Sequence, residues 1–141
     1  MADHADDGYL VQVVNTMSGA VATGTATIPN DDTVPQNTEG FEVMTLAITP
    51  RATTNKLKIE VVINLGTSAT GNLIAGLFQD STASALAAAA VYAGVTNASM
   101  QIKFTHYMTA GTTSATTFKV RIGCNNAGTV TFNGYSSGRF F

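Results

Sequence analysis

Residues 57–65 read LKIEVVINL, and this stretch decides the fold class of the chain. Every second side chain in it, from Leu57 to Leu65, is large and aliphatic, whereas most of the side chains between them are polar or charged. Successive side chains of a β-strand point to opposite faces of a sheet. The alternation therefore predicts a strand with one buried face and one exposed face.

The same alternation recurs at Met44–Thr49, Ile102–Met108 and Phe118–Cys124. Clusters of glycine, asparagine, serine and threonine separate these runs, which is typical of turns. Short strands at regular spacing predict an antiparallel β-sandwich or jelly roll, and the alternation of strands with helices that a parallel sheet needs is not visible. We expect an all-β fold of about eight or nine strands, with residues 1–8 as a flexible leader and residues 9–141 as a single domain.

Two segments, Tyr9–Val14 and Leu73–Phe78, are apolar on both faces of the strand that each is expected to form. A strand at the surface of an antiparallel sandwich has one polar face, so these segments need a second cover. That cover is either another sheet or another subunit, and in so small a domain we favour a subunit interface. The candidate interface residues are Tyr9, Val11, Val13, Leu73, Leu77 and His106.

We also predict the local structure of two further segments, Ala85–Tyr92 and Ile28–Gly40. Four consecutive alanines in the first favour a helix by intrinsic propensity, but a helix this short is marginal, and the segment lies among strands. We predict an extended strand lined with small side chains. The second segment is long for a loop, and we favour an ordered connector over a functional loop.

The composition excludes several classes of protein. Charged residues make up 11% of the chain and the net charge is −2, which argues against nucleic-acid binding because phosphate recognition needs clustered cations. Cys124 is the single cysteine, so neither an internal disulfide nor a cysteine-based zinc site can form, and it is expected to be a small buried side chain. The chain has no apolar run long enough to insert in a membrane, and no secretory signal.

Residues suited to catalysis are scarce, and we expect no enzyme, no cofactor and no metal site. His4 lies in the leader, and His106 lies on the apolar side of its strand. A core or interface histidine is the favoured interpretation of His106, with an ion site or a pH-sensitive contact on a symmetry axis as the alternative. Asp31 and Asp32 are interpreted as turn formers, with calcium binding as the alternative.

Candidate contacts to a ligand come from exposed aromatic and polar side chains. A tyrosine ring stacks on the apolar face of a sugar while its hydroxyl group forms hydrogen bonds. The candidates are Tyr107, Tyr135, Arg139, Asp31 and Asp32.

Several motifs resemble the C-terminal domains of phage tail-fibre and related virion proteins, over nearly the whole chain from about Leu10 onward. That family continues past the position of Phe140 and Phe141 with a glycine-rich turn and a final alternating strand, where this sequence ends. The resemblance implies a last strand that is missing or supplied in another way. The motifs that carry it are Val11–Asn15, Gly19–Thr25, Ile28–Gly40, Met44–Pro50, Leu77–Thr82 and Tyr107–Ser114.

The resemblance implies a jelly roll similar to the trimeric heads of tumour-necrosis-factor-like and C1q-like proteins. It also implies a virion protein that is assembled in the host cytoplasm and acts outside the cell. We expect a tail-fibre tip that attaches to a host surface glycan or protein. The alternatives are a capsid decoration or head-fibre protein that binds the virion shell and, after it, a free carbohydrate-binding module.

Overall fold

The computed structural model describes residues 9–135 and 138–139. Within them it contains ten strands and no helix. The leader predicted at residues 1–8, and Phe140 and Phe141, lie outside the described residues. The strands are β1 (Ala22–Gly24), β2 (Phe41–Ile48), β3 (Lys56–Thr67), β4 (Gly71–Gln79), β5 (Ala87–Ala93), β6 (Ala98–Thr109), β7 (Thr116–Cys124), β8 (Val130–Phe132), β9 (Gly134–Tyr135) and β10 (Gly138–Arg139).

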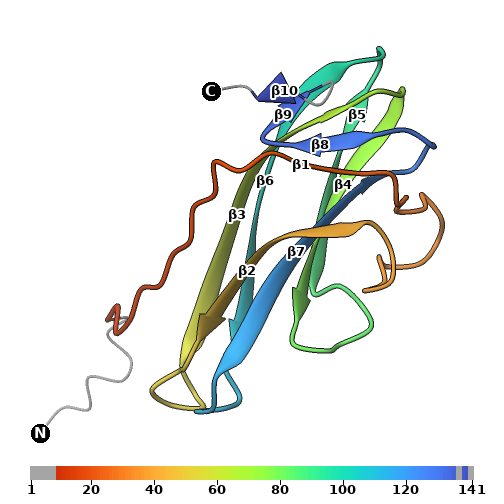
Figure 1. The fold of residues 1–141 in the computed structure, drawn as a ribbon. Coiled ribbons are helices and arrows are strands. Elements are labelled where there is room, and N and C mark those ends of the chain that lie inside the picture. The colour runs from red at the N-terminus through yellow and green to blue at the C-terminus, as the bar shows by residue number, and fades with distance from the viewer. Residues whose placement is uncertain (1–8, 136–137, 140–141) are drawn as a thin grey trace, which may run out of the picture.

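Two four-stranded antiparallel sheets pack against each other (Figure 1). The first sheet has the strand order β1-β8-β3-β6 and the second has the order β2-β7-β4-β5, while β9 and β10 pair as a short ribbon. The predicted all-β sandwich is therefore confirmed. The trimer and the single-domain boundary remain predictions.

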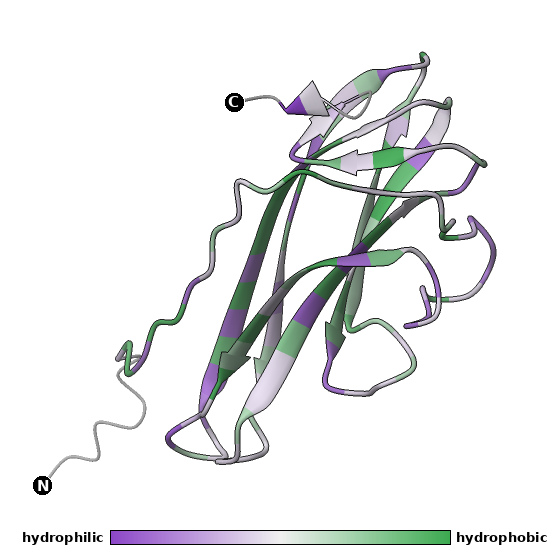
Figure 2. Ribbon diagram, in the orientation of Figure 1, coloured by the Kyte–Doolittle hydropathy of each residue, from purple (hydrophilic) through white to green (hydrophobic). Residues whose placement is uncertain are grey.

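The core lies between the sheets and is built by the alternation that the sequence displays (Figure 2). Leu57, Val61, Ile63 and Leu65 of β3 are buried. They meet the buried side of β7, which consists of Phe118, Val120, Ile122 and Cys124. Cys124 is a free, buried cysteine, as expected.

The segment Leu73–Phe78 lies in β4 and is buried on both faces within the single chain, so its predicted role as a subunit interface is wrong. Leu73 and Leu77 face the core with 0% and 1% of their surface exposed, which leaves nothing for a second copy to contact. Phe78, on the other face of β4, is equally buried. The second cover comes from the chain's own connectors, not from another subunit.

The long segment Ile28–Gly40 supplies much of this cover, as an ordered connector. Its first residue, Ile28, is 1% exposed and donates its backbone N–H to the carbonyl of Cys124 at 3.2 Å. The side chain of Ile28 lies over Gly123, where a Cβ atom would come within 2.8 Å of it. Further along, Gln36 forms a β-bridge with Ser84, which ties the segment to the connector between β4 and β5.

The alanine-rich segment is a strand, as predicted. Residues Ala87–Ala93 form β5 and pair with β4 from Leu77↔Ala87 to Gly71↔Ala93. Tertiary pairing overrides the helical propensity of the four alanines because an isolated helix of this length gains little.

Residues 9–17, here called the N-terminal arm, form no strand, which corrects the expectation for Tyr9–Val14. The arm is extended and leads to β1 along the side of the sandwich that contains β2 and β3 (Figure 1). At its base, the Asn133 side-chain amide donates hydrogen bonds to the carbonyls of Ser18 and Ala20.

The first sheet is incomplete beside β3. On one side β3 pairs with β6 over its whole length, but on the other side it pairs with β8 only from Leu65 to Thr67. The backbone N–H of Asn133 closes this pairing by donating to the carbonyl of Asn64 at 2.8 Å. From Lys56 to Asn64, no other strand of the described residues pairs with this side of β3, which we call the β3 edge.

Candidate functional site

The outer surface of β3 and β6 is the most extended polar surface that the strand register builds, and we call it the β3–β6 face. Antiparallel pairing places Tyr107 opposite Lys58 and Gln101 opposite Asn64. The register thus collects the polar side chains that alternate with the core residues of both strands. The face consists of Lys56, Lys58, Glu60, Val62, Asn64, Gln101, Lys103, Thr105, Tyr107 and Thr109.

Several polar groups on this face pair with each other. Lys58 and Glu60 form an ion pair at 3.3 Å, and the Gln101 amide donates to the Asn64 side-chain oxygen at 3.1 Å. The Lys56 ammonium group donates to the Thr109 hydroxyl at 2.6 Å. These pairs are solvent-exposed, so each adds little stability, about 0–1 kcal/mol. They leave amide, hydroxyl and ammonium groups at the surface.

Tyr107 is the large aromatic side chain on this face, and 67% of it is exposed. A tyrosine that is held by a strand and surrounded by hydrogen-bonding groups suits the binding of a sugar ring. Of the ligand contacts predicted from the sequence, Tyr107 has the most favourable surroundings.

The structure does not bring the other predicted ligand contacts to Tyr107. Tyr135 packs against Gly66, and Arg139 pairs with Gly134 in the β9–β10 ribbon, at the far end of β3. Lys58 is the cross-strand partner of Tyr107, and Gly66 lies eight residues further along β3. The distance along the strand between them is roughly 26 Å.

Asp31 lies in the Ile28–Gly40 segment and serves as a turn former. The backbone N–H and the hydroxyl of Thr33 both donate to Asp31 Oδ1, at 2.9 and 2.6 Å. The hydroxyl and then the backbone hydrogen bond from Thr33 lower the pKa of this carboxyl group below its usual value. Asp32 is exposed in the same turn. Their interpretation as turn formers fits this geometry.

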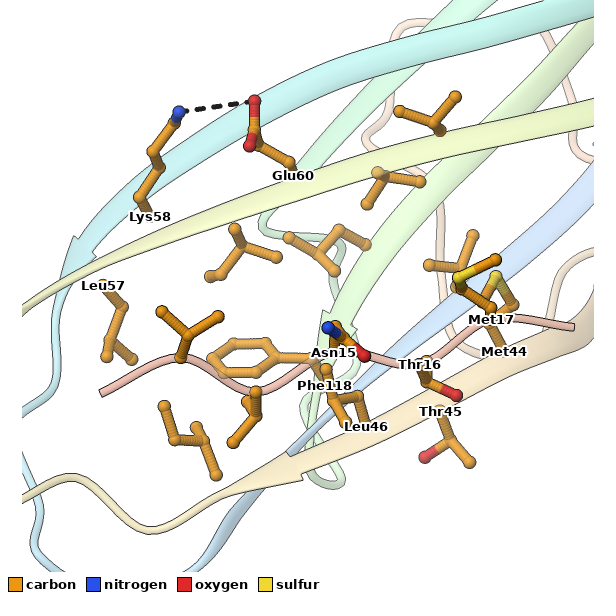
Figure 3. A pocket seen from close by; sticks show the side chains of 18 residues that line it. Asn15, Thr16, Met17, Met44, Thr45, Leu46, Leu57, Lys58, Glu60 and Phe118 are labelled. Carbon is orange, nitrogen blue, oxygen red and sulfur yellow. Dashed lines mark ion pairs between the residues drawn. The ribbon is translucent and has the colours of Figure 1, made fainter.

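A cavity of about 500 Å³ opens between β2 and β3 on the incomplete side of the sandwich (Figure 3). Its inner wall is apolar and includes Met44, Leu57 and Phe118, and the arm lines it from Val13 to Met17. Lys58 and Glu60 point away from it across the outer surface (Figure 3). No pattern in the sequence indicated this cavity. It lies where β3 pairs with no other strand of the described residues.

The remaining predicted interface residues divide between the arm and the core. Tyr9, Val11 and Val13 belong to the exposed arm, where they are accessible to another copy. His106 is half-buried and lies opposite Ile59, on the side of β6 that faces the core. Whether His106 meets a symmetry axis stays a prediction.

A second hollow, of about 320 Å³, is polar and lies on the outer side of the second sheet. Arg121 at its wall is held by the carbonyls of Glu39 and Gly40, at 2.8 and 2.9 Å. Asp80 accepts hydrogen bonds from the Thr117 backbone N–H and the Thr116 hydroxyl, both at 2.8 Å. These contacts fasten connectors to strands, so we assign this hollow a structural role.

In the described part of the chain, no three side chains of His, Cys, Asp or Glu gather as metal ligands would. Nor do residues 9–135 and 138–139 contain a helix of the length and hydropathy needed to cross a membrane. A scan against protein-family models and a search of curated proteins both give no match for this chain.

Proposed function

We propose that this chain is a phage virion structural protein that forms the trimeric, receptor-binding tip of a tail fibre. In this role it attaches to a host surface glycan or protein by contact and performs no chemistry. The motifs that resemble tail-fibre domains suggest the role, and the observed β-sandwich is compatible with it.

The observation that carries the proposal is the β3–β6 face, with exposed Tyr107 beside amide, hydroxyl and ammonium groups. Two long paired strands fix these side chains, so binding a ligand costs little ordering of the protein. The ring of Tyr107 would stack on a sugar, while neighbours such as Lys58 and Thr105 would donate hydrogen bonds.

A trimer makes such a weak site useful. Three equivalent faces on one rigid particle bind a surface that displays many copies of the same glycan. After the first contact, the effective concentration of the others is high. A stacking contact of about 1 kcal/mol per site then contributes at each of the three sites that bind at the same time.

The experiment compares Tyr107→Ala with Tyr92→Ala in binding to host cells and to an array of surface glycans. Tyr92 is a matched control because it is 65% exposed, like Tyr107, but lies on β5 of the other sheet. We expect Tyr107→Ala to lower binding about fivefold per site, and Tyr92→Ala to leave it unchanged.

Equal binding by wild type and Tyr107→Ala would contradict the assignment of the β3–β6 face. Binding to purified capsids and not to host cells would favour the capsid decoration alternative. Hydrolysis of a host polysaccharide by the purified protein would overturn the non-enzymatic role.

A further inference from the structure

The β3 edge presents backbone hydrogen-bonding groups that pair with no other strand of the described residues. Both backbone groups of a strand residue point to the same side of the strand, and the direction alternates from residue to residue. The carbonyl of Asn64 points toward β8, where it accepts from Asn133. The N–H and C=O groups of Val62, Glu60 and Lys58 therefore point to the same side, below the end of β8. Such an edge is a template for one more strand.

The apolar side chains of the N-terminal arm are exposed. Leu10 is 82% exposed, and Val14 is the least exposed of the large apolar arm residues, at 38%. The odd-numbered side carries most of the apolar residues, and its Val13, Asn15 and Met17 line the cavity between β2 and β3. Its exposed fractions are 67% for Tyr9, 50% for Val11, 68% for Val13 and 92% for Met17.

The arm and the β3 edge match in length and chemistry. The arm has nine residues, 9–17, and the edge has nine, 56–64. The arm carries no charge, so no ion would be desolvated on entering the apolar cavity between β2 and β3. The cavity stays open although the arm of the same chain crosses it, which means that this arm does not fill it.

Strand direction disfavours the arm of the same chain as the added strand. β1 is antiparallel to β8, and β8 is antiparallel to β3, so β1 runs parallel to β3. Before it turns into β1, the arm runs in the same direction as β3 (Figure 1). Against its own β3 edge it would form a parallel pair, which is less stable per residue than an antiparallel pair. The arm of another copy is free to enter in the antiparallel direction.

The area available is sufficient for a stable assembly. A large apolar side chain contributes on the order of 100 Å² when it is fully buried, so the exposed apolar groups of one arm amount to roughly 400 Å². With an equal area of groove, each arm would bury on the order of 800 Å², so the three arms of a cyclic trimer would bury roughly 2,400 Å² in all. Each contact is about half the size of a typical specific interface, and every subunit takes part in two of them.

We propose that the arm of a second copy of this chain, residues 9–17, inserts along the β3 edge as an antiparallel strand. Its odd-numbered side faces the cavity between β2 and β3, and the site is incomplete without it. In a trimer the arms pass cyclically from each subunit to the next. The inference rests on the homo-oligomer of the proposed function, and it names the contact that closes this oligomer.

The first test is a proline at the β3 edge. Val62→Pro removes one edge N–H but leaves the pairing of β3 with β6, since that N–H points away from β6. We expect the molar mass from light scattering to fall threefold, to that of the monomer. The matched control Val62→Thr keeps the N–H and should keep the trimer. The circular dichroism spectrum of Val62→Pro must stay that of the folded wild type.

The second test identifies the occupant by disulfide trapping. With the odd-numbered residues facing the cavity, one of the two registers nearest the centre places Val13 opposite Val61 and Gln12 opposite Val62. A chain with Gln12→Cys is mixed with a chain with Val62→Cys and oxidised mildly. We expect a cross-linked pair of chains. The control mixture, Gln12→Cys with Tyr92→Cys, should give none.

Other results would overturn the proposal. A trimer that survives Val62→Pro shows that another contact holds the copies together, while the proposed function stands. A cross-link formed within one chain carrying both Gln12→Cys and Val62→Cys, with none between chains, assigns the β3 edge to the chain's own arm. A monomeric wild type would contradict the trimer and this inference together, but not the binding role of Tyr107.

Discussion

Glycine residues decide, at the scale of single atoms, how closely the Ile28–Gly40 segment lies against the second sheet. Gly40 has a φ of +58°, and a Cβ atom there would lie 2.4 Å from the carbonyl oxygen of Ile122. Gly123 similarly leaves room for Ile28. The segment covers the sheet because two positions lack a side chain.

Gly40→Ala should therefore destabilise the protein by at least about 2 kcal/mol, since a left-handed alanine is strained and its methyl group overlaps the backbone. Gly19→Ala is the control, because nothing lies within 4 Å of its Cβ position. It should change the free energy of unfolding by less than about 0.5 kcal/mol. Urea denaturation measures both. Equal stability of the two variants would show that the connector is not packed as described.

Asp80 ties the end of β4 to the start of β7. The hydrogen bond from the Thr117 backbone N–H, and then that from the Thr116 hydroxyl, lower the pKa of Asp80 below its usual value of about 3.9. A carboxyl group with a lowered pKa stabilises the folded state above the pKa of the unfolded chain. This stabilisation is lost as the pH falls through the folded-state pKa.

We expect Asp80→Asn to lower the urea midpoint at pH 7, with a difference from wild type that disappears as the pH falls from about 5 to 2. Denaturation curves across this range measure it. A difference that is the same at pH 7 and pH 2 would assign the effect to geometry and not to charge.

At the scale of elements, the connector Ile28–Gly40 acts as a cover for β4. A central strand that is apolar on both faces needs a layer on each side. In this molecule one layer is the first sheet and the other is made by connectors, with Ile28 as an anchor.

Ile28→Ala should cost about 2–5 kcal/mol of unfolding free energy, because it leaves a cavity between the connector and Gly123. Val34→Ala in the same connector is the control, since Val34 is exposed and should change stability by less than about 0.5 kcal/mol. Chemical denaturation of both variants measures the contrast. A loss of less than about 1 kcal/mol for Ile28→Ala would show that the connector does not serve as a cover.

At the scale of the whole molecule, the sandwich is closed on one side and open on the other. On the far side the edge strands β5 and β6 lie against each other, whereas β2 and β3 leave a cavity between them. An open apolar side and an exposed apolar arm are the surfaces that the proposed assembly with further copies would cover.

Light scattering of the purified chain at micromolar concentration should therefore give three times the 14.6 kDa of one chain. The apolar arm and cavity are the surfaces that such an assembly would remove from water. A mass of one chain over the whole accessible concentration range would contradict the trimer.

The sequence by itself determined the all-β class and the faces of its strands. Alternation at Leu57–Leu65 and Phe118–Cys124 assigned each side chain to the core or to the surface, because side-chain direction in a strand follows from its two-residue period. The alternation of the strand around Tyr107 also placed this residue on the polar side. These features are local, and a local pattern is sufficient to predict them.

Only the tertiary structure decided what covers each surface. The apolar pattern of Leu73–Phe78 is the same whether the cover is another subunit or the chain's own connector, and the connector proved to be the cover. Likewise, Tyr9–Val14 has the pattern of a strand but pairs with no described strand, and the open β3 edge has no signature of its own. Which strands pair, and which segment packs on each apolar face, depend on residues far apart in the sequence. The pattern within one segment does not predict the segment that it contacts.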